Sequence, residues 1–148
     1  MRLRFILLSV LLIASAYTFA ADDLRLNPRL DYTSDSQDGP LITGKHMQDG
    51  VVAGKPNYVI IYAEGCYNSK HQAQRTVELW KKYQGRVNFV IVDLDRERSS
   101  SQDELITKFY HGYIPHVVVL DKAGKPLYND AGEIEESKIS AILDRALE

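Results

Sequence analysis

The apolar stretch of residues 58–63 narrows the possible folds of this chain more than any other feature, because it leads almost directly into a helical pattern. Its β-branched and aromatic residues predict a short strand, and the spacing of apolar residues over 69–83 predicts a helix. Cys66, the only cysteine among 148 residues, stands between the two. Backbone N–H groups at a helix N-terminus favour a thiolate. This junction therefore predicts a reactive, exposed thiol; a buried cysteine that packs as a small apolar residue is the alternative.

The remaining chain predicts further strands and helices. Residues 87–94 predict a buried strand and residues 116–129 a hairpin. A capping box that begins at Ser101 opens a second helix, and helical spacing returns near the end of the chain. We also expect an edge strand at residues 41–42 and a short helix at residues 46–52. The resulting order, strand–helix–strand–helix–strand–strand–helix, predicts an α/β fold with a central mixed β-sheet flanked by helices on both faces.

The first 45 residues differ in composition from the rest. Residues 1–20 carry two arginines, an apolar run and small residues before Ala21, which is typical of a cleaved signal peptide; an uncleaved anchor is the alternative. We therefore expect an exported protein, periplasmic or secreted, without a stable membrane anchor after cleavage. Residues 21–45 are polar and turn-rich and predict an extension that is at best partly ordered. Residues 46–148 form the predicted domain.

Charge and the scarcity of metal-ligating residues exclude other classes of partner. Without residues 1–20, Lys and Arg fall from 18 to 16 against 20 acidic residues, so the mature chain is acidic and is not expected to bind nucleic acid. A single cysteine allows no internal disulfide. The spacing of the four histidines matches no metal motif, and we expect neither a metal nor a cofactor; a role of His71 or His116 beside the thiol is a weaker possibility.

Two motifs carry a family resemblance. Residues 62–70, Tyr-Ala-Glu-Gly-Cys-Tyr-Asn-Ser-Lys, resemble the strand–active-site–helix segment of the thioredoxin superfamily. Residues 112–115, Gly-Tyr-Ile-Pro, resemble its cis-proline loop. The resemblance extends over about residues 55–147 and implies a thioredoxin-like fold. It also implies that Ile114 and Pro115, joined by a cis bond, form a docking edge for an extended substrate beside the thiol.

Three residues depart from the pattern of that superfamily. Ser69 replaces the second cysteine of its C-x-x-C motif, Gly65 stands where a tryptophan usually precedes the first cysteine, and Ile60 replaces a buried aspartate. Ser69 cannot resolve a mixed disulfide, although its hydroxyl could hydrogen-bond the Cys66 thiolate. The alternative is that Ser69 is an ordinary helix-start residue.

These residues lead to two hypotheses about function. The first is an exported thioredoxin-like protein that performs monothiol exchange, of the isomerase or shuttle type, on protein or small-thiol disulfides. Cys66 and Ser69 would be its catalytic residues, and Tyr67, with Ile114 and Pro115, would contact the substrate. The alternative is a redox-inactive thioredoxin-fold module that binds proteins.

Overall fold

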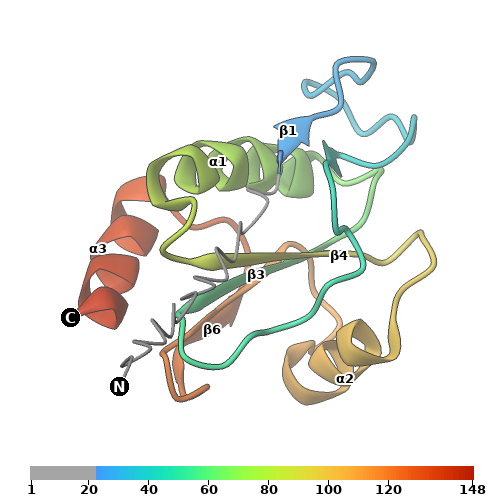
Figure 1. Ribbon diagram of the computed structural model, residues 1–148. Coiled ribbons are helices and arrows are strands. Elements are labelled where there is room, and N and C mark those ends of the chain that lie inside the picture. Colours follow the sequence, from blue (N-terminus) through green and yellow to red (C-terminus); the bar gives the residue numbers. More distant parts are fainter. Residues whose placement is uncertain (1–22) are drawn as a thin grey trace, which may run out of the picture.

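The computed structural model describes residues 23–148, so the predicted signal peptide lies outside the described residues. Its centre is a four-stranded mixed sheet in the order β4-β3-β5-β6 (Figure 1). The central strand β3 pairs in parallel with β4 and antiparallel with β5, which forms a hairpin with β6. The strands are β3 (Asn57–Tyr62), β4 (Asn88–Asp93), β5 (His116–Leu120) and β6 (Pro126–Ala131).

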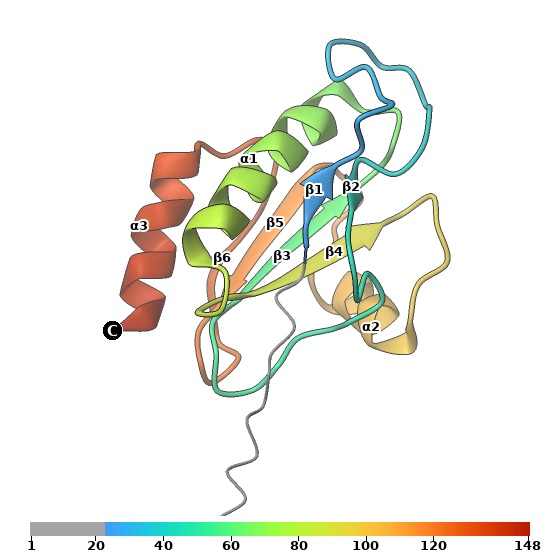
Figure 2. The same ribbon diagram turned by 45° about the horizontal axis from the view of Figure 1, so that its top comes forward.

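Helices cover the sheet on both faces. Helices α1 (Tyr67–Tyr83) and α3 (Glu136–Leu147) lie on one face and α2 (Ser100–Phe109) lies on the other (Figures 1 and 2). The predicted α/β architecture is confirmed. Within residues 23–148, the helices are too short or too polar to cross a membrane.

Strand β3 separates two apolar clusters because its side chains alternate between the faces of the sheet. Ile60 points into the cluster beneath α1 and α3, together with Tyr58 and Tyr62. Val59 and Ile61 belong to the cluster beneath α2. All six residues of β3 are buried. Apolar residues at successive positions are therefore needed here, which explains the unbroken apolar run in the sequence.

The helix boundaries follow the caps rather than the apolar pattern. Helix α1 begins at Tyr67, two residues before the predicted start, because Cys66 is its N-cap. Helix α2 is capped by Ser99, whose hydroxyl accepts a hydrogen bond from the Gln102 N–H, so the capping box predicted at Ser101 was wrong. The cap is Ser99, two residues earlier, in a run of three serines that offers more than one register. The Gln102 side chain does not complete a capping box, because it donates to Met47 O, Asp49 O and Ile91 O instead.

Two predicted elements before β3 need correction. Of the two residues predicted as an edge strand, 41 and 42, only Ile42 lies in β2 (Ile42–Thr43), which pairs with β1 (Arg25–Leu26) in a separate small sheet. The helix predicted over residues 46–52 is absent from the described structure; a turn replaces it, closed by a hydrogen bond from Asp49 N–H to His46 O. His46 has a φ of +57°, a left-handed conformation that a right-handed helix does not allow.

The N-terminal segment, residues 23–45, is packed onto the domain. Leu24, Leu41 and Ile42 are buried in the same apolar cluster as α1 and α3. Partial order was expected because these residues stand apart among polar residues and turn signals. Their burial depends on surfaces offered by distant parts of the chain, which local composition does not reveal.

We expect Ile60→Asp to lower the free energy of unfolding by more than about 3 kcal/mol, because the aspartate would replace a fully buried side chain in an apolar cluster. Ile60→Val, which removes one methylene, should cost only about 1 kcal/mol. Urea unfolding of both variants at pH 7 checks this. A loss for Ile60→Asp no larger than that for Ile60→Val would contradict the burial described for β3.

Candidate active site

Cys66 stands at the end of a short loop between β3 and α1. Its backbone N–H donates to Ala63 O at 3.4 Å, and its carbonyl accepts the Lys70 N–H at 3.0 Å. The sulfur accepts a hydrogen bond from the Ser69 N–H at 3.4 Å, so the thiol itself caps the helix. The side chain is partly exposed. A partly exposed cysteine whose sulfur accepts a backbone N–H suits a nucleophilic thiol.

Ser69 is close to Cys66 in the chain but does not act through its hydroxyl. The residue is fully buried, and its Oγ makes no hydrogen bond within residues 23–148. The expected hydroxyl–thiol hydrogen bond is therefore replaced by the one from the Ser69 backbone N–H. A side chain at this position lies beneath the surface of the site, one helical turn beyond Cys66.

The proline loop reaches the same end of the sheet as Cys66. Ile61 of β3 is in register with His116 of β5, so Pro115 follows at the level of Tyr62, where β3 ends. The Ile114–Pro115 bond is cis, and Pro115 O accepts the Gly132 N–H at 2.7 Å. Pro115 is buried, whereas Ile114 is partly exposed.

The tyrosines around these loops divide into buried and exposed ones. Tyr62 is fully buried, but Tyr67 is 40% and Tyr113 74% exposed. The Tyr67 ring lies 4.1 Å from the His71 ring, centroid to centroid, and His71 Nδ1 is 3.4 Å from Glu133 Oε1. Tyr67 and Tyr113 therefore offer apolar rings to a partner on the two loops that carry Cys66 and Pro115.

The N-terminal segment also belongs to this site, which the sequence did not indicate. The Asp35 carboxylate accepts the Tyr67 N–H at 2.8 Å, at the first residue of α1. A Cβ added at Gly65 would lie 3.3 Å from Gln37 Cβ and 3.4 Å from Asp35 O. Figure 2 shows the loop between β1 and β2 beside the start of α1. The small residue at position 65, where a tryptophan was expected by resemblance, was the available signal.

Lys70 fixes this segment to the helix. Its side chain is fully buried, and Nζ donates to Asp31 O at 2.5 Å, Ser34 O at 2.7 Å and Ser36 Oγ at 3.2 Å. All three ammonium donors therefore have oxygen partners. Asp31 in turn is held by Thr33, whose N–H and hydroxyl hydrogen bonds lower the pKa of the Asp31 carboxyl to about 2.

A buried acidic corner lies on the other side of the loop. Glu64 is buried and pairs with Arg96 at 2.5 Å, and the Glu64 N–H donates to Asp95. Burial away from water, together with the nearby Glu64 carboxylate, raises the pKa of Asp93 to about 6. Asp93 Oδ2 has no hydrogen-bond partner in the described part of the chain.

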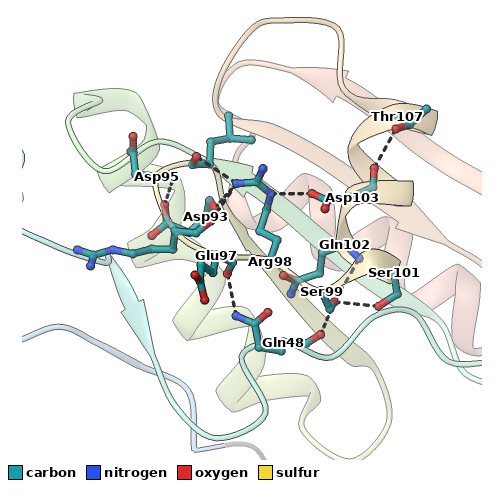
Figure 3. Close-up of polar contacts among 12 residues, drawn as sticks. Gln48, Asp93, Asp95, Glu97, Arg98, Ser99, Ser101, Gln102, Asp103 and Thr107 are labelled. Carbon is teal, nitrogen blue, oxygen red and sulfur yellow. Dashed lines mark hydrogen bonds and ion pairs between the residues drawn. The ribbon is translucent and has the colours of Figure 1, made fainter.

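Arg98 secures the connection from this corner to α2. Its guanidinium donates to the carbonyls of Asp93 and Leu94 and to the Asp103 carboxylate (Figure 3). A cavity of about 280 Å³ lies beside the corner, between residues 40–48 and β4. Asp93 and Arg96 line it, but none of the residues predicted for the thiol site does.

The histidines do not complete a catalytic pair with Cys66. His116 is fully buried, with Nε2 2.6 Å from Asn129 Oδ1. His71 faces Tyr67 and Glu133 instead. Over residues 23–148, neither makes a hydrogen bond to Cys66, and no group of three His, Cys, Asp or Glu side chains could hold a metal ion.

Two curated proteins with thiol-redox names are similar to this chain. "Thioredoxin-like protein HCF164, chloroplastic" from Oryza sativa subsp. japonica is 29% identical over 122 residues, which cover 82% of this chain and 45% of that protein. "Thiol:disulfide interchange protein TxlA homolog" from Synechocystis is 30% identical over 94 residues, which cover 61% and 51%. The chain thus spans about half the length of these curated relatives. No family model matches the chain.

Solved structures agree in fold. A thioredoxin-like protein from Clostridium perfringens has a TM-score of 0.54 at 22% identity, covering 64% of this chain and 73% of its own. Fasciola hepatica thioredoxin has a TM-score of 0.50 at 23% identity, covering 64% and 83%. This chain is similar to thioredoxin-like proteins, and its fold is thioredoxin-like. Its thioredoxin-like fold explains why the Cys66 and Pro115 loops meet at one end of the sheet.

We expect stability to fall as pH rises from about 4 to about 6, in part because of Asp93. Its pKa is about 6 in the folded protein against an ordinary value of 3.8, so in this window the folded state binds more protons than the unfolded chain. Asp93→Asn keeps an oxygen for the Asp95 N–H and removes this titration. We compare the unfolding free energy of the variant with that of wild type at each pH. This difference should favour the variant by on the order of 1 kcal/mol more at pH 7 than at pH 4.

Urea unfolding of both proteins at several pH values between 3.5 and 7.5 tests this expectation. The slope of unfolding free energy against pH should become less negative in Asp93→Asn. An unchanged slope would show that the Asp93 carboxyl is not the group that takes up the proton on folding.

Proposed function

We propose that this protein performs monothiol thiol–disulfide exchange through Cys66. The observation that carries the proposal is a partly exposed cysteine at the N-terminus of α1 whose sulfur accepts the Ser69 N–H, at the sheet end that also holds the cis-Pro115 loop. A thiolate is the attacking species in such exchange, and helix N-terminal N–H groups stabilise it. Ile114 and Pro115, with the exposed Tyr67 ring, would form the edge along which a substrate chain lies.

The exchange balances without a second cysteine in this chain. The Cys66 thiolate attacks one sulfur of a disulfide, the Cys66–substrate S–S bond forms, and the other sulfur leaves as a thiolate that takes up a proton. A free thiol of the substrate, or an external small thiol, then attacks the mixed disulfide and releases Cys66. With a substrate thiol the net result is rearrangement; with an external thiol, that thiol is oxidised as the substrate is reduced.

The relatives support this proposal at the level of chemistry. The name of the Synechocystis relative describes thiol–disulfide interchange, and the rice relative is named thioredoxin-like. Protein disulfides or small-thiol disulfides are accordingly the proposed substrates. Because Ser69 occupies the second position of the motif, the isomerase or shuttle type of exchange fits better than autonomous reduction.

Export and domain organisation form part of the same proposal. Residues 1–20 carry the features of a signal peptide, and an oxidising compartment would supply disulfide substrates. Residues 46–148 would be the thioredoxin-like domain and residues 21–45 an N-terminal extension, of which residues 23–45 pack against the domain. The mature chain would then act in the periplasm or outside the cell, without a membrane anchor.

We expect the native protein to fail in insulin reduction with multiple turnovers, because Ser69 cannot attack the mixed disulfide, form a disulfide with Cys66 and so release the target as a thiol. It should still form a mixed disulfide with a small disulfide such as cystamine, detectable as a mass increase that dithiothreitol reverses. Ser69→Cys should form an internal disulfide and gain some turnover, since position 69 lies one helical turn from Cys66.

Cys66→Ser is the control and should form no adduct. If native protein and Ser69→Cys both form no adduct with any disulfide, a redox-inactive protein-binding module becomes the better description. Unaided insulin turnover by the native protein would show that Ser69 is not the limiting feature.

A further inference from the structure

Residues 31–37 occupy one side of the Cys66 loop. Asp35 and Gln37 approach Gly65 so closely that even a Cβ at this position would press on them. Asp35 also accepts the first N–H of α1, that of Tyr67. A large side chain before the cysteine, which the superfamily resemblance led us to expect, has no room here. The segment therefore covers the side of the loop on which such a side chain would lie.

Hydrogen bonds from buried groups hold residues 31–37 in place. The three Lys70 hydrogen bonds join the segment to α1 at Asp31, Ser34 and Ser36, with the ammonium fully buried. Two of the three acceptors are backbone carbonyls, so the bonds fix the path of the chain rather than single side chains. A second attachment lies deeper, where the Leu41 N–H donates to Tyr62 Oη at 3.2 Å at the end of β3. Figure 1 shows the same loop above the end of the sheet, next to the start of α1.

Exposed tyrosines stand on the two segments that carry Cys66 and Pro115. Tyr113, on the proline loop, is 74% exposed, and Tyr67 is exposed at the start of α1. The surroundings of the Cys66 loop are thus asymmetric: residues 35 and 37 pack against Gly65, whereas the two tyrosines are open to solvent.

From this asymmetry we propose that residues 31–37 are a specificity-determining wall of the Cys66 site. The wall admits small-thiol disulfides and disulfides on extended chains, which approach along Tyr67 and Tyr113. It excludes disulfides on the broad face of a folded protein, because such a face would meet Asp35 and Gln37 before its sulfur reached Cys66. This inference rests on the proposed exchange function and names its substrate class.

The Asp35→Ala/Gln37→Ala double variant tests the wall. It removes the Asp35 carboxylate, with its hydrogen bond from the Tyr67 N–H, and shortens Gln37 to its Cβ, while leaving the acceptors of Lys70 untouched. Both residues are exposed, so the fold should persist. Asp38→Ala is the matched control, since it removes an exposed carboxylate from the adjoining chain. Alkylation rates of Cys66 are measured with N-ethylmaleimide and with a maleimide attached to a folded carrier protein.

The double variant should react about tenfold faster with the carrier reagent, because fewer orientations of a bulky partner are blocked, while its rate with N-ethylmaleimide changes less than about twofold. Asp38→Ala should match wild type with both reagents. Equal changes in the alkylation rate with both reagents, or no change with either, would contradict the proposed wall. Lys70→Met, which frees the whole segment, should shift the same ratio further and raise amide exchange over residues 31–37; an unchanged ratio despite faster exchange would also overturn it.

Mixed-disulfide formation is measured in parallel with cystamine and with a folded protein disulfide. A shifted alkylation ratio without any mixed disulfide would leave the wall standing and reject the exchange function. Mixed disulfides with an unshifted alkylation ratio would keep the exchange function and reject the wall.

Discussion

Burial of β3 on both faces is the constraint on which the rest of the structure depends. The strand pairs along both edges, and its five residues from Tyr58 to Tyr62 send side chains alternately into two apolar clusters. Helices must therefore cover both faces, and the parallel partner β4 requires a crossover, which α1 supplies. Because that crossover begins immediately beyond β3, the first turn of α1 is held at the end of the most buried strand. The connection from β3 to α1 therefore fixes the position of Cys66.

The same strand also anchors the N-terminal segment. Tyr62 is the last residue of β3, and its hydroxyl accepts the Leu41 N–H while its ring is buried in the cluster that includes Ile42. The segment leaves this anchor toward the loop that carries Gly65, where Lys70 holds it again. The end of β3 thus positions both Cys66 and the wall of residues 31–37. A substitution that shifts this end of the strand would displace both.

Sequence patterns revealed the architecture of this chain better than its details, for a physical reason. Periodicity and apolar runs report burial that repeats along an element, so β3, α1 and the order of the elements from β3 onward were predicted correctly. The true cap of α2 was missed because Ser99, Ser100 and Ser101 offer equivalent hydroxyls, and only the fold selects Ser99. The wall was missed because Lys70 is buried by backbone carbonyls far away in sequence, and a lysine in a helical pattern normally predicts a solvated side chain.

Each of the three residues that depart from a dithiol site has its own structural explanation. Ile60 fills an apolar cluster, Gly65 makes room for residues 35–37, and Ser69 is buried beneath the thiol without a hydrogen-bond partner for its hydroxyl in the described chain. Exchange through a lone thiol needs none of the three replaced groups, because attack requires only a reachable sulfur and a stabilised thiolate, and release comes from outside. A dithiol cycle needs a second sulfur and a group that takes its proton. Ile60 occupies the position of that carboxylate. A cysteine at position 69 would therefore supply the second thiol but not the group that takes its proton. Turnover would remain limited by deprotonation of the buried thiol.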